Sequence, residues 1–489
     1  MSPSTVTPVP TAGGRRAPVA VAIVAASLPV FMATLDNLVV TGALPVLHTD
    51  LGASLDQLQW VVNAFTLSFA SLMLGAATVG DRWGRRRVFL LGMAVFTLAS
   101  IAAALSNSPE TLIAARAVQG VGAAAITPLS LALVASSVPP ERRAAAIGIW
   151  GGVTGLGVAL GPVIGGAVID GLNWQWIFWV NVPVAVLALP LILWALPESY
   201  GRRVPLDLAG IALGAGAVFT TVWAVVHVDA EGWGSTGVLV PLVLGIVALT
   251  GFLLRQATAR FPLLPLRLFR SRSFSAANAL MFLFQLGAMG SVFLLTQDLQ
   301  IALGYTPLQA GIRTLPWTAV PMLVAPIAGI VAGRIGPRPL LVSGLVLTTG
   351  GLTWIAAQLG SGTHYLELVP GLVLAGIGTA LVFAPSATAV LHGLDSTDHA
   401  TASSANATLR EIGLALGVAI LTLVFQNSGG DLSPAGFTAG APDAVFVGAG
   451  FVAVAALVAL LVPGRGALLT AAISEDRPLT STRTPARSR

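Results

Sequence analysis

The sequence predicts an all-α polytopic membrane protein with fourteen transmembrane helices, two six-helix halves plus two inserted helices, and both termini in the cytoplasm. Three observations lead to this fold class. The 489 residues are 55% hydrophobic and only 9% charged, whereas ordinary soluble domains are about 25% charged. Apolar runs of membrane-crossing length recur along the whole chain. Arginines follow every second run except the twelfth, whose loop has none.

The apolar runs define the expected helices. The hydrocarbon core of a bilayer is about 30 Å thick, so a helix needs about 20 residues to cross it. The alternating ten-residue segments that are typical of a membrane β-barrel are absent from the sequence. The expected helices occupy 18–44, 58–79, 88–106, 111–134, 144–169, 174–196, 208–228, 237–254, 274–297, 308–332, 339–357, 367–391, 403–426 and 443–463.

The arginines predict the topology. All 25 basic side chains are arginine, and apart from Arg116, Arg313 and Arg410 they precede the first helix, follow even-numbered helices or close the chain. Loops after odd-numbered helices carry acids or histidine instead. Because positively charged loops stay in the cytoplasm, we expect both termini inside. Arginine in place of all lysine, beside abundant alanine and glycine, is typical of GC-rich bacteria, so we expect the bacterial inner (plasma) membrane.

Several classes of protein are excluded by composition. No cysteine is present, and the five histidines lack metal-ligand spacing, so no metal site is expected. We find no nucleophile constellation and no phosphate-binding loop, which argues against an enzyme and an ATP-driven pump. No basic domain suggests nucleic acid as a partner. The ends, 1–17 and 464–489, are expected to be disordered cytoplasmic tails, and 1–17 has no signal-peptide core.

Matching glycines indicate an internal duplication. Four pairs are each separated by 256 residues, and the positions fall in helices four and five of the first half and in their counterparts of the second half. We therefore expect six-helix bundles at 18–198 and 261–463, with two inserted helices at 199–260. The pairs are Gly120/Gly376, Gly122/Gly378, Gly157/Gly413 and Gly161/Gly417.

Five motifs occur in order along the first half. They are "LDNLVVTGALP" (35–45), "GDRWGRRRVFL" (80–90), "LIAARAVQGVGAAA" (112–125), "GVALGPVIGG" (157–166) and "WQWIFWVNVP" (174–183). Together they resemble the motifs of the major facilitator superfamily, and specifically its fourteen-helix drug:proton antiporter branch. Departures from the family pattern occur at Ala77, Leu38 and Thr41. The resemblance implies export driven by a proton gradient, with no cofactor, through alternating access.

Asp36 and Arg116 are the expected proton-coupling residues. Both lie in the outer half of the membrane at similar depths, counted at about 1.5 Å per residue. A buried carboxylate is costly, so Asp36 is expected to take up a proton or pair with a cation. Arg116 keeps its own proton and is the candidate partner. The alternatives are a carboxylate permanently satisfied by donors such as Thr34, and a static salt bridge.

Glu411 is the third expected coupling residue, because an acid inside a membrane helix is unusual. It could bind a second proton or a cationic substrate. The alternative is that Glu411 pairs with another helix while Arg410 extends to the surface. Asp298 and Arg313, which flank the loop after helix nine, are expected to form a peripheral pair.

Two glycine-containing segments are expected to control conformational change. In helix five a smooth stripe with a possible bend suits a seal between the halves, although ordinary tight packing would use the same residues. In the loop after helix two, the glycines permit a tight turn and Asp81 could cap the next helix or pair with an arginine. The helix-five residues are Gly157, Gly161, Pro162, Gly165 and Gly166, and the loop residues are Gly80, Asp81, Arg82, Gly84, Arg85 and Arg86.

The expected function is export of hydrophobic or amphipathic, and potentially cationic, organic compounds in exchange for protons. The pocket should be mostly apolar with a few polar groups, each of which could instead bridge helices. The candidates are Asn37, Asn63, Gln119, Gln285 and Asn406. The alternatives are a facilitator or proton symporter that imports a small solute, and a non-transporting membrane sensor. Expected partners are the substrate, protons and the lipid bilayer, and the protein is expected to be a monomer.

Overall fold

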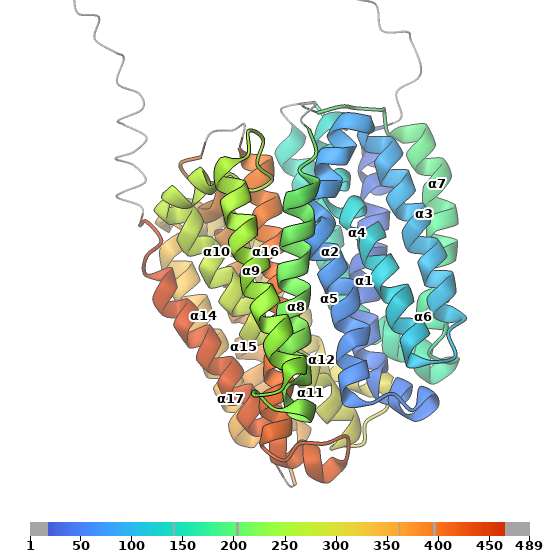
Figure 1. Ribbon diagram of the computed structural model, residues 1–489, viewed down its shortest axis with the longest axis vertical. Coiled ribbons are helices and arrows are strands. Elements are labelled where there is room, and N and C mark those ends of the chain that lie inside the picture. The colour runs from blue at the N-terminus through green and yellow to red at the C-terminus, as the bar shows by residue number, and fades with distance from the viewer. Residues whose placement is uncertain (1–17, 140–141, 202–204, 361, 395–397, 465–489) are drawn as a thin grey trace, which may run out of the picture.

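The computed structural model describes residues 18–139, 142–201, 205–360, 362–394 and 398–464. All regular structure within these ranges is helical, and most helices run along one common direction (Figure 1). The two predicted tails lie outside the described residues, apart from Gly464. The arginines at positions 15, 16, 202 and 203 lie outside them as well.

The described helices make the chain a multi-pass membrane protein. Twelve of them are long and apolar enough to cross a membrane, and thirteen if α2, bent by 51° between Met73 and Gly75, counts as one span. Helices α12 and α13 have 12 and 16 residues and adjoin at Ala319. The helices are α1 (Val19–Leu51), α2 (Leu55–Trp83), α3 (Arg85–Ala104), α4 (Pro109–Ser137), α5 (Arg143–Gly171), α6 (Trp176–Trp179), α7 (Asn181–Ala195), α8 (Leu208–Glu231), α9 (Thr236–Thr258), η2 (Leu266–Arg270), α10 (Arg272–Phe284), η3 (Gln285–Met289), α11 (Gly290–Ile301), α12 (Pro307–Thr318), α13 (Val320–Ile335), α14 (Pro337–Gln358), α15 (Tyr365–Leu391), α16 (His399–Asn427) and α17 (Pro434–Ala459).

The two ends of the molecule are named from α1. The proximal end is where α1 begins, and the distal end is where it stops, at Leu51. Gly52 ends α1 in a left-handed conformation with φ of 66°, which glycine adopts without strain. The next helix starts at once, because the Ser54 hydroxyl accepts a hydrogen bond from the Gln57 backbone N–H in a capping box. Local sequence thus fixes this short distal turn.

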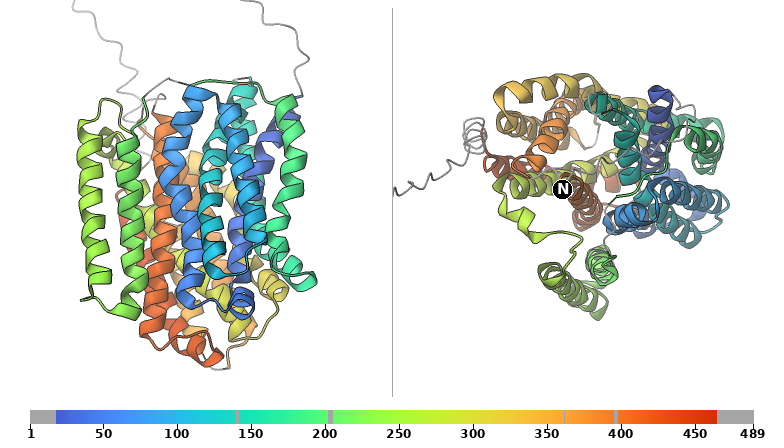
Figure 2. Two further views of the ribbon diagram at one scale, coloured as in Figure 1. Left: turned by 45° about the vertical axis from the view of Figure 1, so that its right-hand side comes forward. Right: turned by 90° about the horizontal axis from the view of Figure 1, so that it is seen from above.

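The helices pack in two groups. Helices α1–α7 form the N-terminal group and α10–α17 the C-terminal group, and each packs mainly within itself. Helices α8 and α9 stand at the edge of the molecule, with α9 outermost (Figure 2). Helix α8 contacts both α2 and α16, one helix from each group. The α8–α9 pair therefore covers the seam where the two groups meet.

Aromatic and small side chains hold α8 against that seam. The rings of Trp60 on α2 and Trp223 on α8 have centroids 5.5 Å apart, and Phe219 lies 5.6 Å from Trp60. On the other side, Val222 and Val226 of α8 belong to the same buried cluster as alanines of α16. Helix α8 therefore touches both groups through apolar contacts.

A polar network ties the proximal ends of α8 and α9 together. The buried carboxylate of Asp207 caps α8 by accepting from the Gly210 N–H at 3.0 Å, and it accepts from Arg255 at 2.9 Å and Gln256 at 3.1 Å. Gln256 in turn accepts from the Leu264 N–H at 3.0 Å. Burial acts to raise the pKa of Asp207, but these hydrogen bonds and the Arg255 charge outweigh it, so the pKa lies below 3.8.

Asp207→Asn is expected to lower thermal stability near neutral pH by the equivalent of about 1 kcal/mol, because asparagine can still cap α8 but the charge-assisted hydrogen bonds from Arg255 and Gln256 are lost or become neutral ones. Because the folded pKa of Asp207 is depressed, its stabilisation is complete above the ordinary aspartate range and is lost as pH falls through the folded pKa. Melting curves of wild type and variant should therefore converge in acid. Exposed Asp50 provides the matched Asp50→Asn control. Equal curves at neutral pH would contradict the prediction.

The span from α10 to α11 is helical but irregular. Its middle turn, η3 at Gln285–Met289, is a π-helix, a form frequent at functional sites. Here the backbones of other helices come close, since a Cβ at Gly290 would lie 2.7 Å from the Gly417 carbonyl oxygen of α16.

Candidate functional site

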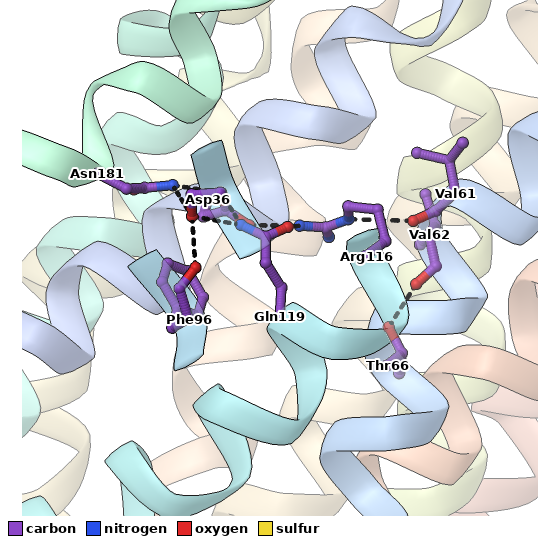
Figure 3. A network of polar contacts seen from close by, with 9 residues as sticks. Asp36, Val61, Val62, Thr66, Phe96, Arg116, Gln119 and Asn181 are labelled. Carbon is purple, nitrogen blue, oxygen red and sulfur yellow. Dashed lines mark hydrogen bonds and ion pairs between the residues drawn. The ribbon is translucent and has the colours of Figure 1, made fainter. Parts of the chain in front are cut away.

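Asp36 on α1 and Arg116 on α4 form an ion pair inside the N-terminal group. The contact joins Arg116 Nη1 to Asp36 Oδ2, and both side chains are fully buried (Figure 3). The predicted contact between these residues is therefore present. Two opposite charges without water around them interact strongly, but each has lost its hydration, so the pair is stable only with further hydrogen bonds.

Neutral amides complete the coordination of the carboxylate. Asp36 Oδ1 accepts from Asn181 Nδ2 at 2.7 Å and from Gln119 Nε2 at 3.2 Å (Figure 3). Arg116 also donates through Nη1 to Gln119 Oε1 at 2.8 Å and through Nε to the Val61 carbonyl at 3.2 Å. Gln119 therefore bridges the pair, since its carbonyl faces the guanidinium and its amide faces the carboxylate.

Ser100 on α3 anchors the two amides. Its Oγ accepts from Gln119 Nε2 at 2.8 Å and from Asn181 Nδ2 at 3.2 Å, and donates to the Phe96 carbonyl at 2.8 Å. The expected donor Thr34 forms no hydrogen bond to Asp36 among the described residues. The carboxylate is thus satisfied by amides and a guanidinium and not by a hydroxyl group.

The network is incomplete at two atoms. Arg116 Nη2 and Asn181 Oδ1 are buried and have no hydrogen-bond partner in the described part of the chain. The Phe65 ring covers the guanidinium at 4.3 Å from Cζ to the centroid, which compensates in part through a cation–π contact. Buried polar atoms without partners are costly, so a rearrangement that supplies partners is energetically accessible.

Two members of the site were not singled out from the sequence. Asn181 lies within the motif at 174–183, but the motif alone does not say which of its side chains turns inward. Ser100 lies in an apolar helix and carries no sequence signal. Both are completely buried. The signal that the sequence offered for Asn181 was a polar amide inside a predicted apolar helix.

Glu411 and Arg410 lie together on α16 and are half-buried. Neither forms an ion pair or a hydrogen bond through its charged group with another described residue. The Arg410 guanidinium lies over the Phe383 ring of α15, 4.9 Å from its centroid. The alternatives in which Glu411 pairs with another helix and Arg410 extends to the surface are therefore wrong.

Asp298 and Arg313 do not pair. The Arg313 guanidinium lies 3.8 Å from the Tyr305 ring centroid and donates to the Gln309 carbonyl at 3.2 Å. Asp298 is buried on α11, and no other described side chain pairs with its carboxylate. The prediction of a peripheral Asp298–Arg313 pair is wrong, because the Arg313 guanidinium instead stacks on the Tyr305 ring of the distal loop.

The polar pocket candidates fall in different places. Gln119 belongs to the ion-pair network, and Asn406 donates to Asn278 at 3.0 Å, so it bridges helices as the alternative expected. Asn63 is completely buried with both amide atoms unpartnered among the described residues, and Gln285 has an unpartnered Oε1. Asn37 is half-buried. The candidates do not form one cluster of hydrogen bonds.

The arginine-rich turn after α2 contacts the end of α7. Asp81 pairs with Arg85 at 2.7 Å, and Glu198 accepts from the backbone N–H groups of Arg86 and Arg87 at 2.9 and 3.3 Å. Glu198 therefore caps α3, the role considered for Asp81. Gly84, with φ of 110°, makes the turn. Gly80 packs against Leu129 of α4, and Arg82 is exposed.

The glycine stripe of α5 faces α1, within its own group. A Cβ at Gly157 would lie 3.2 Å from the Phe31 carbonyl, at Gly161 2.8 Å from Leu38 Cβ, and at Gly165 2.7 Å from Val39 Cγ1. The expectation of a seal between the halves is wrong for these three residues. They allow tight helix packing, which was the alternative.

The contact between the groups uses other residues of α5. A Cβ at Gly166 would collide with the start of α12, and one at Gly311 of α12 would collide with the Pro162 carbonyl. Asp170 then accepts from Thr306 Oγ1 at 2.6 Å and from the Leu308 N–H at 3.2 Å. Backbones of α5 and α12 thus touch at the distal end.

The two helix groups are linked at the distal end, whereas the proximal half of α5 has a glycine face without close neighbours. Gln300 of α11 donates to the Gly42 carbonyl of α1 at 2.9 Å, a second distal link between the groups. Toward the proximal end of α5, four glycines would place a Cβ with no other described atom within 4 Å. The groups are therefore linked at the distal end, and this glycine face of α5 has no close neighbour among the described residues. The four glycines are Gly148, Gly151, Gly152 and Gly155.

Comparisons with known proteins agree with this architecture. Residues 26–296 and 277–488 match the family model described as Major Facilitator Superfamily. The chain is 36% identical to the tetracenomycin C resistance and export protein of Streptomyces glaucescens, over 88% of this chain and 80% of that protein. It is 37% identical to multidrug resistance protein Stp of Mycobacterium tuberculosis, over 82% and 74%. A bacterial homolog of the human lysosomal transporter Spinster, solved inward-facing and unoccupied, shares the fold with a TM-score of 0.66 at 17% identity, over 91% and 96%.

Proposed function

The chain belongs to the Major Facilitator Superfamily, and on that basis we propose that it exports hydrophobic or amphipathic organic compounds, antibiotics among them, in exchange for protons. Relatives named for resistance and export, similar over most of their length, support the direction of transport and the kind of cargo. The family consists of transporters, so no enzymatic reaction is assigned. The proton gradient supplies the energy and no cofactor is required.

The membrane arrangement in this proposal has fourteen spans. Helices α12 and α13 together form one span that is interrupted at Ala319, and bent α2 forms another. The proximal end faces the cytoplasm, in keeping with the positive-inside rule, because Arg85, Arg86 and Arg87 lie there. The bundles are 18–198 and 261–463, with 199–260 inserted between them. The protein works as a monomer in the bacterial inner (plasma) membrane.

The single observation that carries the proton coupling is the buried Asp36–Arg116 pair. A carboxylate away from water exists in two forms whose balance depends on its cation: ionised beside Arg116, and protonated once the guanidinium moves away. Unpartnered Arg116 Nη2 and Asn181 Oδ1 give the network alternative hydrogen bonds. Asp36 is therefore the proton carrier, and Arg116 is the group that stabilises its ionised form.

Conformational coupling runs through α1. Asp36 and Arg116 belong to the same helix group, so rigid rocking of the two groups would not separate them. Helix α1, however, contacts α11 and α12 of the other group, whereas the main neighbours of α4 are α1, α2, α3 and α5. Opening the distal contacts would therefore shift the helix of Asp36 relative to the helix of Arg116, and this shift links proton transfer to the distal gate.

In this proposal the substrate enters from the cytoplasmic side, at the proximal end. Glycines of α5 that lack neighbours, such as Gly151, provide a smooth face that can meet the other group when that side closes. The turn of Gly80 to Arg86 holds α2 and α3 to the end of α7 during this movement. Glu411, half-buried and unpaired, offers a second acid to a proton or to a cationic group of the substrate.

Everted vesicles with an imposed pH gradient test the proposed function. The cytoplasmic face is then outside, so an acidic lumen should drive labelled compounds into the vesicle, and each compound should cause protons to leave. A panel of cationic and neutral amphipathic drugs is measured against vesicles that lack the protein. Import by a symporter would give proton movement with the opposite relation to drug movement. Transport that ignores the pH gradient would contradict proton exchange.

A further inference from the structure

Arg410 is a charged side chain in the middle of α16 that no part of the mechanism above uses. It stands 11 residues after His399, where α16 begins, which places it about 16 Å along the helix at about 1.5 Å per residue. A cation at this depth is costly unless it has a partner or an aqueous surface. The groups around the Arg410 guanidinium therefore indicate the role of its charge.

The surroundings of Arg410 contain no paired carboxylate. The described residues provide neither an ion pair nor a hydrogen bond to its guanidinium, and the buried Nε is unpartnered. The adjacent acid, Glu411, attracts Arg410 through its charge, but it points about 100° away around the helix and forms neither an ion pair nor a hydrogen bond with it. The charge of Arg410 is thus available to a ligand.

The orientation of Arg410 is nevertheless fixed. Its guanidinium lies over the Phe383 ring of α15, with Cζ 4.9 Å from the ring centroid. Such stacking holds the planar group through one face and leaves its edge free to donate paired hydrogen bonds. An arginine fixed by an aromatic ring is well suited to bind a carboxylate in a bidentate manner.

The helices around α16 do not enclose Arg410 completely. Helix α16 packs against α10, α15 and α17 of its own group and against α2 and α8 on its other side. Arg410 is nevertheless only half-buried. Because a guanidinium at mid-membrane depth cannot face hydrocarbon without a large cost, the exposed part of Arg410 should face protein or water between the helix groups and not lipid.

We propose that Arg410, stacked on Phe383, is a binding site for the anionic group of amphipathic substrates, so that the cargo of this exporter includes aromatic or aliphatic carboxylates. Neighbouring Glu411 then serves compounds of the opposite charge. One α16 segment that carries both charges, each half-buried, accepts cationic, anionic and zwitterionic cargo. The inference rests on the proposed export function only for the statement that the bound compound is cargo.

Equilibrium binding without any gradient tests this site. The probe is pyrenebutyrate, an aromatic carboxylate, compared with its uncharged methyl ester, on the purified full-length protein in detergent. Wild type is expected to bind the carboxylate about tenfold or more tightly than the ester, the effect of one charge-assisted hydrogen bond. In Arg410→Gln the carboxylate should fall to the affinity of the ester, while the ester keeps its wild-type affinity.

Two further variants separate charge from structure. Arg313→Gln removes another arginine stacked on an aromatic ring, at the distal end, and should leave the preference for the carboxylate unchanged. Glu411→Gln should keep or strengthen carboxylate binding, because it removes a negative neighbour. If wild type shows no preference for the carboxylate, or if Arg410→Gln retains it, the proposal is overturned. Since no proton gradient is present, either result is independent of the vesicle experiment on proton exchange.

Discussion

Asp36→Asn is expected to abolish substrate accumulation in everted vesicles, down to the level of vesicles without the protein, and to abolish drug-evoked proton movement with it. Asparagine keeps the size of the side chain, and its single carbonyl oxygen can accept either from Arg116 or from the amides of Gln119 and Asn181, but not from both sides at once. It cannot bind or release a proton, however. A transporter without its exchangeable proton should still bind cargo but should not convert a pH gradient into transport.

The specificity of this loss is checked with a second acid on the same helix. Asp50 is exposed at the distal end of α1, so Asp50→Asn should transport like wild type. Substrate binding to Asp36→Asn, measured separately, should persist. Gradient-driven accumulation by Asp36→Asn would show that another acid carries the proton, and Glu411 would then be the first to test.

Arg116→Met is expected to be the most destabilising single change in the candidate site. Removing one partner of a buried ion pair leaves the other charge uncompensated, which costs about 3–5 kcal/mol. Asp36 would keep only the amides of Gln119 and Asn181. Thermal unfolding of the purified protein should therefore show a much lower midpoint, and protein levels in the membrane should fall.

The double variant tests the reason for this loss. In Asp36→Asn/Arg116→Met no buried charge remains, so most of the lost stability should return while proton exchange stays absent. Additive destabilisation by the two changes would show that the residues do not act as a pair. Arg313→Met, which removes a half-buried arginine outside any ion pair, serves as the matched control.

Depth along the helices was enough to predict the central contact. Counting residues from the ends of two apolar segments placed Asp36 and Arg116 at similar levels, and the structure brings them into contact. The amides around them could not be found in the same way. Asn181 and Ser100 come from two further helices, and which face of each helix turns inward depends on packing between all four.

Packing direction also explains the predictions that failed. The glycine stripe of α5 indicates close approach of another helix but does not say which one, and the partner of Gly161 is α1 in its own group. The contact between the groups instead uses Gly166 and Gly311, which lie far apart in the sequence. Similarly, no sequence pattern predicted the π-helical turn at Gln285–Met289. These features arise only when the helices assemble.

Proton release on substrate binding tests the central claim most directly. Purified protein in weakly buffered detergent solution is mixed with a transported cationic drug, and the change in pH is followed with an indicator dye. The account predicts that in wild type the drug binds the form with the Asp36–Arg116 pair, so molecules in which Asp36 is protonated release that proton as the drug draws them into this form, whereas Asp36→Asn binds the drug and releases none. Equal proton release by both proteins, or none by wild type while it binds the drug, would contradict the account.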